Sequence, residues 1–511
     1  MNVHHKILRG VSGGLFFSLV SIVVSFVQLR LILDFLPPNM AGLWLLFITV
    51  GAYIAFFDLG LSPTLSREIG FALGAAQSDR HQQTKSIADL LATCSRLFRV
   101  LSISVFCLAV LLGGYLVWAT VPSPNYREVA LAWFVFSGGA ALNLWASSSF
   151  AALYGLGYVG TERLIRSVAL LAGLALSVSV LYAGLGIIGL AMAWTVQGGL
   201  ARLVARRVLR HKYPDLLMVR GTASLRLAKA IVGPSLKWAA MGLGAILILQ
   251  TDNAVIAAVL GPAAIPQYEA VAKIAITAMS LSLLLATATS PHISKAYAEK
   301  NMALVTSLLS RSVRLSVAVV ASMAAFVAVF GDMIITLWLG DGRFVGFPVL
   351  WTLLLMVLLE AHHVSMATAT MATGHIVFAK PALLAGFLNL VISIILAHYL
   401  GLWGVALGTL IAQMLTNNWY APYVTLKHFG VPVGAHVRTV LMPMLALLAG
   451  LLTTNILLRQ FFHEYGNFIA ITISLCLSGL IAAGMVFIWM LTEKEQWIAK
   501  TRFAALFGSK I

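Results

Sequence analysis

The sequence predicts an all-α polytopic membrane protein with about fourteen transmembrane helices, arranged as two six-helix bundles and two further C-terminal helices. Three observations predict this class: the composition, the spacing of apolar runs and a pair of internal sequence matches. Hydrophobic residues make up 60% of the 511 residues, charged residues only 10%, and the mean hydropathy is +0.95. A soluble domain needs about 25% charged residues to cover its surface. The composition therefore excludes a soluble enzyme, a disordered chain and a nucleic-acid-binding protein, despite a net charge of +17.

Runs of about 20 apolar residues locate the predicted spans. They lie near residues 11–36, 40–63, 97–119, 129–153, 164–184, 186–205, 234–260, 266–290, 313–338, 346–371, 378–399, 402–423, 438–458 and 468–491. The first run is too long for the core of a signal peptide and has no small-residue cleavage pattern, so we expect an uncleaved first helix.

The distribution of Lys and Arg predicts the orientation of these spans. In an alternating topology, 28 of the 34 basic residues fall in loops on one side, and only Arg127, Arg343 and Arg459 fall in loops on the other. Cytoplasmic loops carry the excess of positive charge, so both termini are predicted to be cytoplasmic. The densest basic segment, residues 202–237, has two interpretations: an amphipathic cytoplasmic helix held against anionic lipid headgroups, or a solvated linker that fixes topology.

Two internal matches indicate a repeat. Aligning Leu36 with Leu260 gives an offset of 224 residues, and aligning residues 189–193 with 404–408 gives an offset of 215. Six spans per half is an even number, so the halves share one orientation and are related by an axis along the membrane normal. The predicted organisation is an N-terminal bundle (1–205), a basic cytoplasmic linker (206–233), a C-terminal bundle (234–424), and helices 13 and 14 with a basic tail (425–511).

Several of these segments resemble a known family. The stretch from Gly374-His375 to Leu400-Gly401-Leu402-Trp403-Gly404-Val405-Ala406, with Leu388-Asn389-Leu390 inside it, looks like spans 10–12 of bacterial polysaccharide flippases. Asp252-Asn253-Ala254-Val255-Ile256, leading to Leu260-Gly261 and Tyr268, looks like their spans 7–8, and Asp58-Leu59-Gly60-Leu61 is similar to the end of their span 2. The chain thus resembles the multidrug/oligosaccharidyl-lipid/polysaccharide exporter (MOP) superfamily over essentially its whole length.

The resemblance implies a central cavity between the two bundles and transport by alternating access. The implied function is a flippase that moves undecaprenyl-pyrophosphate-linked oligosaccharide, such as an O-antigen (lipopolysaccharide), capsule or exopolysaccharide unit, across the bacterial inner membrane. The implied partners are this lipid-linked oligosaccharide, a proton or sodium ion exchanged as in an antiporter, membrane lipids, and polysaccharide polymerase and chain-length proteins. It implies no cofactor, no metal and no enzyme activity.

Two alternatives remain open at this stage. A cation-coupled multidrug exporter of the same superfamily would have acids dominating its cavity, although drug exporters typically keep twelve spans. A membrane glycan polymerase or ligase is disfavoured, because the predicted exterior loops are all short. There is also no glycine-rich phosphate-binding loop, so direct coupling to ATP is not expected.

Six ionisable residues fall well inside the predicted spans, and they are the candidate functional residues. A charge near the bilayer centre costs about 2.5–3.5 kcal/mol, so six facing lipid would cost on the order of 15–20 kcal/mol. We therefore expect them to face a polar pathway or one another. They are Arg30, Asp58, Asp252, Glu269, Lys273 and Glu360.

Arg30 and Lys273 are predicted to lie at matching depths, each roughly 10 Å below the outer surface and one in each half. One hypothesis is that both hold the diphosphate of the cargo, with Arg as a bidentate fork and Lys as a point charge. The alternative is local pairing, since Asp34 follows Arg30 by four residues and Glu269 precedes Lys273 by four.

The other carboxylates suggest different roles. Glu360, near the middle of its span and followed by His362 and His363, is the candidate carrier of the coupling proton, and an interhelical hydrogen bond is the alternative. Asp252, beside Gln250 and Asn253, is a candidate for substrate binding or ion coupling. Glu269 and Asp58 are candidates for substrate binding, and for Asp58 helix capping is equally favoured. His362 and His363 point about 100° apart on a helix, which disfavours a metal site.

Overall fold

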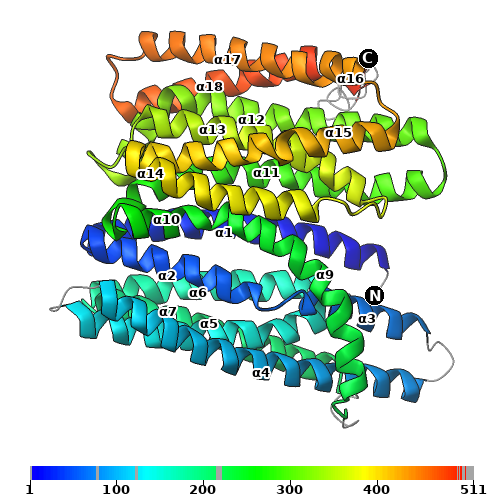
Figure 1. Cartoon of the computed structure of the whole chain (residues 1–511). Coiled ribbons are helices and arrows are strands. Elements are labelled where there is room, and N and C mark those ends of the chain that lie inside the picture. The colour runs from blue at the N-terminus through cyan, green and yellow to red at the C-terminus, as the bar shows by residue number, and fades with distance from the viewer. Residues whose placement is uncertain are drawn as a thin grey trace. The chain divides into compact units, whose positions relative to one another are not determined.

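The computed structural model of the chain describes residues 3–75, 80–120, 125–214, 221–491, 493, 495–497 and 501. All regular secondary structure within these residues is helical (Figure 1). In the described part of the chain, twelve helices are long and apolar enough to cross a membrane. A thirteenth span results if Gly242–Ile248 and Thr251–Val259, bent by 42°, count as one. The predicted all-α polytopic class is confirmed.

The difference between this number and the predicted fourteen lies at Gly401. Residues Ala379–Phe429 form one apolar run, although Gly401 has φ 60° and ψ −137° and breaks helix α14 (Ala379–Leu415) at that point. Such a backbone conformation favours glycine, because a Cβ atom would be strained there. The break falls between the predicted spans 378–399 and 402–423. The fourteen predicted segments lie mostly on helices, although 40–63 includes the turn at residues 57–60 between α2 and α3.

The chain divides into two compact units, Met1–Pro266 (unit 1) and Gln267–Ile511 (unit 2). In unit 1, α5 packs on α4 and α7, α1 packs on α6, and the bent pair α9–α10 contacts α2. Its helices are α1 (Val3–Phe35), α2 (Pro38–Phe56), α3 (Leu61–Ala75), α4 (Arg80–Thr120), α5 (Tyr126–Gly155), α6 (Val159–Tyr182), α7 (Gly186–Lys212), α9 (Leu225–Leu249), α10 (Thr251–Val259) and the short 3₁₀ turn η2 (Pro262–Ala264). Residues 215–220 of the basic segment lie outside the described residues.

The two segments matched by the first repeat alignment contact each other in unit 1. Helix α2 begins with Pro38 in its first turn, where proline is well tolerated, and η2 packs against this helix. A Cβ atom at Gly42 would lie 1.7 Å from the carbonyl oxygen of Pro262. The approach of the two backbones therefore requires glycine at position 42.

Unit 2 repeats part of this pairing, because α12 and α13 pack as α4 and α5 do, and α13 and α15 pack as α5 and α7 do. Helix α12 packs on α13, α13 packs on α15, and α17 and α18, the predicted helices beyond the repeat, pack on α12 (Figure 1). Its helices are α11 (Ile265–Ala298, beginning at the boundary), α12 (Met302–Leu339), α13 (Phe347–Met371), α14, α15 (Asn417–Phe429), α16 (Val433–His436), η3 (Val437–Leu441), α17 (Met442–Phe461), α18 (Asn467–Met485) and η4 (Val486–Met490).

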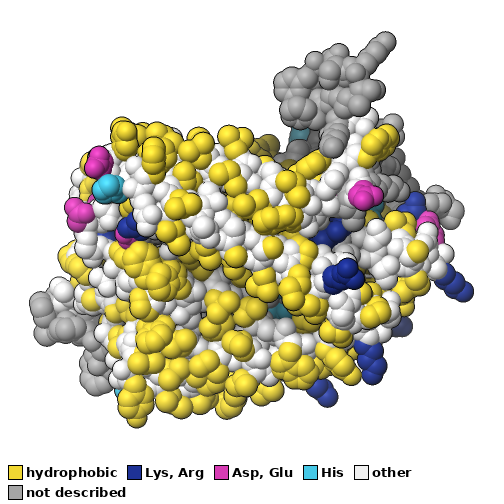
Figure 2. Space-filling model, turned by 90° about the horizontal axis from the view of Figure 1, so that it is seen from above, with side chains coloured by type: hydrophobic (Ala, Val, Ile, Leu, Met, Phe, Trp, Pro, Cys, Tyr) yellow, Lys and Arg dark blue, Asp and Glu magenta, His cyan; other side chains and the backbone are white. Residues whose placement is uncertain are grey.

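The exposed side chains of these helices are largely apolar, as expected for a surface in contact with lipid. Figure 2 shows hydrophobic side chains across most of the visible face, while most of the visible Lys and Arg side chains gather near one end. Large apolar residues such as Leu111, Phe387 and Leu480 are more than half exposed. Together with the long apolar helices, this surface identifies a multi-pass membrane protein.

Candidate functional site

Buried polar side chains line the contact of α13 with the C-terminal part of α14 and with α15 in unit 2. We call these four pairs the polar ladder. They are Glu360 Oε2–Gln413 Nε2 (2.6 Å), His363 Nδ1–Asn418 Oδ1 (2.7 Å), Thr370 Oγ1–Thr425 Oγ1 (2.8 Å) and Thr373 Oγ1–His428 Nε2 (2.9 Å). Buried polar groups are costly unless they are hydrogen-bonded, and each of the first three pairs satisfies at least one such group, whereas Thr373 and His428 are half-buried.

The spacing of the ladder shows how its helices are aligned. The partners are separated by 53, 55, 55 and 55 residues along the chain. From one pair to the next, the residue numbers of both partners increase, so α13 and α15 run parallel. The ladder follows one face of α13 from Glu360 to its C-terminal end, and Thr373 lies just beyond that end.

The pair at the start of the ladder can hold a proton. Glu360 is only 6% exposed and accepts a hydrogen bond from the side-chain amide of Gln413, which is 1% exposed. The other atom of that amide, Gln413 Oε1, is buried and has no partner among the described residues. An ionised Glu360 accepts from the amide N–H, whereas a protonated Glu360 can donate to the amide oxygen after the amide turns over. The amide of Gln413 can therefore act either as donor to Glu360 or as acceptor from it.

The two adjacent histidines point to different helices, as predicted. His362 Nε2 lies 2.8 Å from Nε2 of His436 on α16, and Nδ1 of His363 donates to Asn418 on α15. His362, His363 and His436 are all buried. In the part of the chain that the structure describes, no group of three or more His, Cys, Asp or Glu side chains is placed to hold a metal ion.

Arg30 and Lys273 each form the local ion pair that was the alternative to diphosphate binding. Nε of Arg30 lies 3.4 Å from Asp34 on α1, and both side chains are about half exposed. Nζ of Lys273 lies 3.3 Å from Glu269 on α11, and both are about one-fifth exposed. Each cation thus has a carboxylate neighbour and also an accessible surface.

Asp252 and Asp58 lie at helix starts in unit 1. Asp252 lies in the first turn of α10, after the break at Gln250. Its two neighbours contact α2: Asn253 donates to Thr49 over 3.1 Å, and the Thr251 hydroxyl lies 3.3 Å from that of Tyr53. Oδ1 of Asp58 accepts the backbone N–H of Ser62 over 2.9 Å, at the start of α3. This bond is the capping interaction that was one of the two interpretations of Asp58.

Several polar partners were not predicted from the sequence. Gln413, Asn418 and His436 are neutral residues far along the chain from α13, and no spacing rule links them to it. A further pair, Asp332 on α12 and Arg459 on α17, forms a bidentate ion pair with N···O distances of 2.7 and 2.9 Å. The sequence analysis assigns Arg459 to a loop and does not single out Asp332, and a separation of 127 positions gives no local signal.

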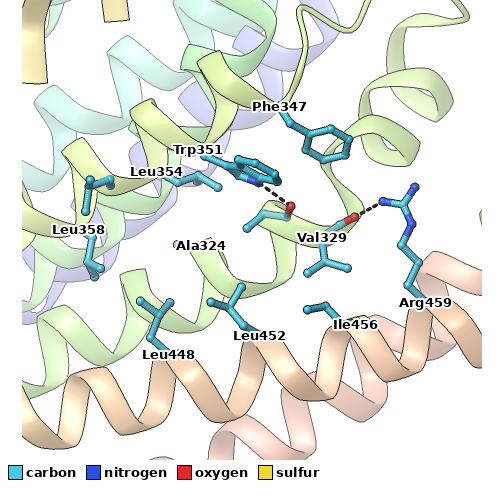
Figure 3. Close-up of a pocket in the computed structure, with 12 residues that line it drawn as sticks. Ala324, Val329, Phe347, Trp351, Leu354, Leu358, Leu448, Leu452, Ile456 and Arg459 are labelled. Carbon is cyan, nitrogen blue, oxygen red and sulfur yellow. Dashed lines mark hydrogen bonds between the residues drawn. The ribbon is translucent and has the colours of Figure 1, made fainter. Parts of the chain in front are cut away.

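A cavity of about 490 Å³ separates α12, α13 and α17 beside this ion pair (Figure 3). Its walls are apolar: Leu354, Leu358, Leu448 and Leu452 point into it from α13 and α17. The polar groups at its edge are already engaged, because Arg459 bonds to Asp332 and to the carbonyl of Val329. The cavity therefore lacks the groups that would bind a polar headgroup.

Comparison with known proteins gives two kinds of match. Residues 161–342 match the family model described as "Polysaccharide biosynthesis protein". A comparison with curated proteins gives no match. Among solved structures, the chain is similar to an inward-facing multidrug resistance MATE family transporter of the MOP superfamily, with 18% identity, a TM-score of 0.66, and coverage of 81% of this chain and 96% of that one. The chain has the MOP fold.

Other structures with this fold include a flippase. The lipid II flippase MurJ, in an inward closed conformation, is 12% identical with a TM-score of 0.65, and the match covers 93% of this chain and 99% of MurJ. A MATE structure in complex with MaD3S gives 17% identity and a TM-score of 0.60, with 86% and 98% covered. The predicted resemblance to the superfamily is confirmed at the level of the fold. The scores for MATE and MurJ are nearly equal, so the fold by itself does not separate the two branches.

Proposed function

We propose that this chain is a flippase that moves lipid-linked oligosaccharide across the bacterial inner membrane. One observation carries the proposal: the polysaccharide biosynthesis family model matches residues 161–342 of a chain whose MOP fold is also that of a lipid II flippase. The cargo is an undecaprenyl-pyrophosphate-linked unit of O-antigen, capsule or exopolysaccharide, and an ion gradient drives its movement. Both termini lie in the cytoplasm.

The cations of the local ion pairs bind the diphosphate of the cargo. Arg30 and Lys273 each have a carboxylate four residues away, and the distances of 3.4 and 3.3 Å are longer than those of a tight charge-assisted hydrogen bond. A diphosphate offers more acceptor oxygens than one carboxylate, so it can displace Asp34 from Arg30 and Glu269 from Lys273. Glu269 and Asp252 then accept hydrogen bonds from the hydroxyl groups of the sugar. The hydrogen bond from Ser62 to Asp58 supports a capping role for Asp58.

Glu360 carries the coupling proton. Its carboxyl is buried against Gln413, whose free amide oxygen can receive a hydrogen bond from the protonated form. Alternating-access transporters place coupling groups near the bilayer midplane, where Glu360 is predicted to lie. Asp252 is the next candidate for this role.

A reconstituted flipping assay tests the proposal. Purified protein in liposomes receives a fluorescent undecaprenyl-pyrophosphate oligosaccharide, and a membrane-impermeant quencher reports the fraction reaching the outer leaflet under an imposed pH or sodium gradient. We expect gradient-dependent flipping by the wild type and its loss in an Arg30→Gln, Lys273→Gln double variant that inserts at the wild-type level. Normal flipping by the double variant would remove both residues from the binding site.

The MATE neighbours favour a second candidate, a cation-coupled multidrug exporter. The acids within the membrane, which outnumber the cations among the six candidate residues, agree with it. The same liposomes distinguish the two functions when loaded with a cationic fluorescent drug. Gradient-driven drug movement without movement of the lipid-linked oligosaccharide would establish the exporter and reject the flippase.

A further inference from the structure

Unit 1 contains a basic pocket at the end of α7 that the proposed transport function does not use. The pocket has a volume of about 340 Å³ and lies among α4, α5 and α7. Four guanidinium groups line it, together with the indole of Trp145. We call it the arginine pocket, and its arginines are Arg99, Arg202, Arg206 and Arg210.

None of these four arginines is neutralised by a carboxylate. Within the described ranges, no acid forms an ion pair with any of them, and no Asp or Glu lines the pocket. The nearby Asp89 on α4 is already engaged, because it accepts the backbone N–H of Thr222 over 2.6 Å and lies 3.4 Å from Lys85. Four like charges around one cavity repel one another unless an anion enters.

Other clustered arginines in the chain, unlike those of the arginine pocket, are paired with an acid. Glu162 on α6 pairs with both Arg163 and Arg166. In unit 2, Glu495 lies 3.2 Å from Arg311 and 3.0 Å from Arg314. Those arginine pairs carry their own counter-charge, whereas the arginine pocket does not.

The donors of the pocket are held in place by an aromatic ring. The guanidinium of Arg202 stacks on Trp145 with its carbon 3.5 Å from the ring centroid, and that of Arg99 lies 5.3 Å from the same ring. Stacking leaves the N–H groups at the edge of a guanidinium available for hydrogen bonds. Nη1 of Arg202 and Nε1 of Trp145 are both buried and have no partner among the described residues. The pocket thus presents fixed donors that lack an acceptor.

We propose that the arginine pocket binds the phosphate of a lipid headgroup. Arginine forks match phosphate oxygens bidentately, and basic pockets between helices at the cytoplasmic surface suit anionic headgroups. The pocket lies at the predicted membrane boundary, since the apolar run of α7 ends near residue 205 and Arg206 and Arg210 follow it. A soluble phosphate has the same chemistry, and the experiment separates the two sources.

The test compares two adjacent arginines of α7. Both side chains are exposed and carry the same charge, but Arg206 lines the pocket and Arg207 does not. Native mass spectrometry of the purified full-length protein counts bound phosphatidylglycerol during titration, with phosphatidylcholine as the neutral lipid. We expect Arg206→Gln to weaken binding of phosphatidylglycerol about five- to tenfold and Arg207→Gln to leave it unchanged. Equal effects of the two variants would overturn the proposal, because the lipid would then respond only to surface charge.

A second arm identifies the source of the phosphate. Inorganic diphosphate is added to protein freed of phosphatidylglycerol, and thermal stability is measured. No stabilisation by millimolar diphosphate, together with Arg206-dependent lipid binding, supports a lipid ligand. Stabilisation that disappears in Arg206→Gln, without Arg206-dependent lipid binding, would overturn the lipid assignment in favour of a soluble anion. Both measurements are repeated on Arg202→Gln, which removes the arginine that stacks on Trp145. Neither measurement involves transport, so the result stands whether or not the chain is a flippase.

Discussion

The contact of α5 with α7 in unit 1 and the contact of α13 with α15 in unit 2 correspond in the predicted repeat, yet their chemistry differs. In the α5–α7 contact, Thr195 donates to the backbone carbonyl of Val135, and a Cβ atom at Gly139 would lie 2.4 Å from the Thr195 hydroxyl. These residues are 60 and 56 positions apart, close to the 55 of the polar ladder. The α5–α7 contact thus combines glycine, a hydroxyl bonded to backbone and the stacking of Arg202 on Trp145, whereas the polar ladder pairs side chains and includes the buried acid Glu360.

The comparison shows which residues of the two helix contacts are needed for close packing and which are not. Small residues let two membrane helices approach closely, and dispersion then holds them together. Glutamate and histidine in the equivalent place add polar groups that need partners and do not improve apolar packing. Since α5 and α7 pack on each other without a buried acid or histidine, we expect Glu360 and His363 to serve transport rather than helix packing. The predictions below test that expectation, beginning with the largest effect.

Glu360→Gln is expected to lower gradient-driven flipping to the background rate. Glutamine keeps the size of the side chain and can still pair with the amide of Gln413, but it cannot bind and release a proton. Binding of lipid-linked oligosaccharide should persist, as measured by native mass spectrometry. Thr370→Val is the matched control, because it removes a non-titratable member of the same ladder and should leave flipping intact.

Wild-type flipping by Glu360→Gln would exclude Glu360 as the carrier of the coupling proton. If Glu360→Gln flips at the wild-type rate with the same dependence on pH, Glu360 is a structural hydrogen-bonding residue and the two helix contacts differ only in packing. Asp252 at the start of α10 would then be tested in the same way.

Gly139→Ala is expected to destabilise the protein, whereas Gly138→Ala is not. A Cβ at Gly139 would lie 2.9 Å from the backbone of Thr195, while the nearest atom to a Cβ at Gly138 is on Phe106, 3.8 Å away. Both changes gain the same helix propensity, so the difference between the variants isolates the overpacking, about 1–3 kcal/mol in the free energy of unfolding. Reversible unfolding in mixed micelles measures it. Equal stabilities would show that α5 and α7 separate easily and that their close approach is not what joins them.

The sequence predicted the helices much better than their partners. Hydropathy located all fourteen segments, and four-residue spacing identified the Arg30–Asp34 and Lys273–Glu269 pairs, because both signals are local. Glu360 was singled out as a charge inside a span, but its partner Gln413 was not. That partner depends on which helix packs beside α13, and apolar surfaces facing lipid or another helix look alike in sequence. For the arginine pocket, the sequence indicated the basic segment that supplies Arg202 and contact with anionic lipid headgroups as one interpretation, but not that Arg99 joins it at Trp145.

The smallest expected effect concerns the neutral pair of the ladder, Thr370 and Thr425. Both side chains are fully buried, and their hydroxyl oxygens lie 2.8 Å apart. Thr370→Val or Thr425→Val alone leaves the other hydroxyl without this partner, whereas the double change removes both polar groups. A double-mutant cycle in the free energy of unfolding should therefore give a coupling of about 0.6 kcal/mol, typical of side-chain hydrogen bonds between membrane helices. A coupling of zero would mean that the hydroxyls turn to their own backbone carbonyls, as Thr370 already does toward Met366. In that case this part of the α13–α15 contact would resemble the α5–α7 contact, and only the titratable pairs would distinguish unit 2.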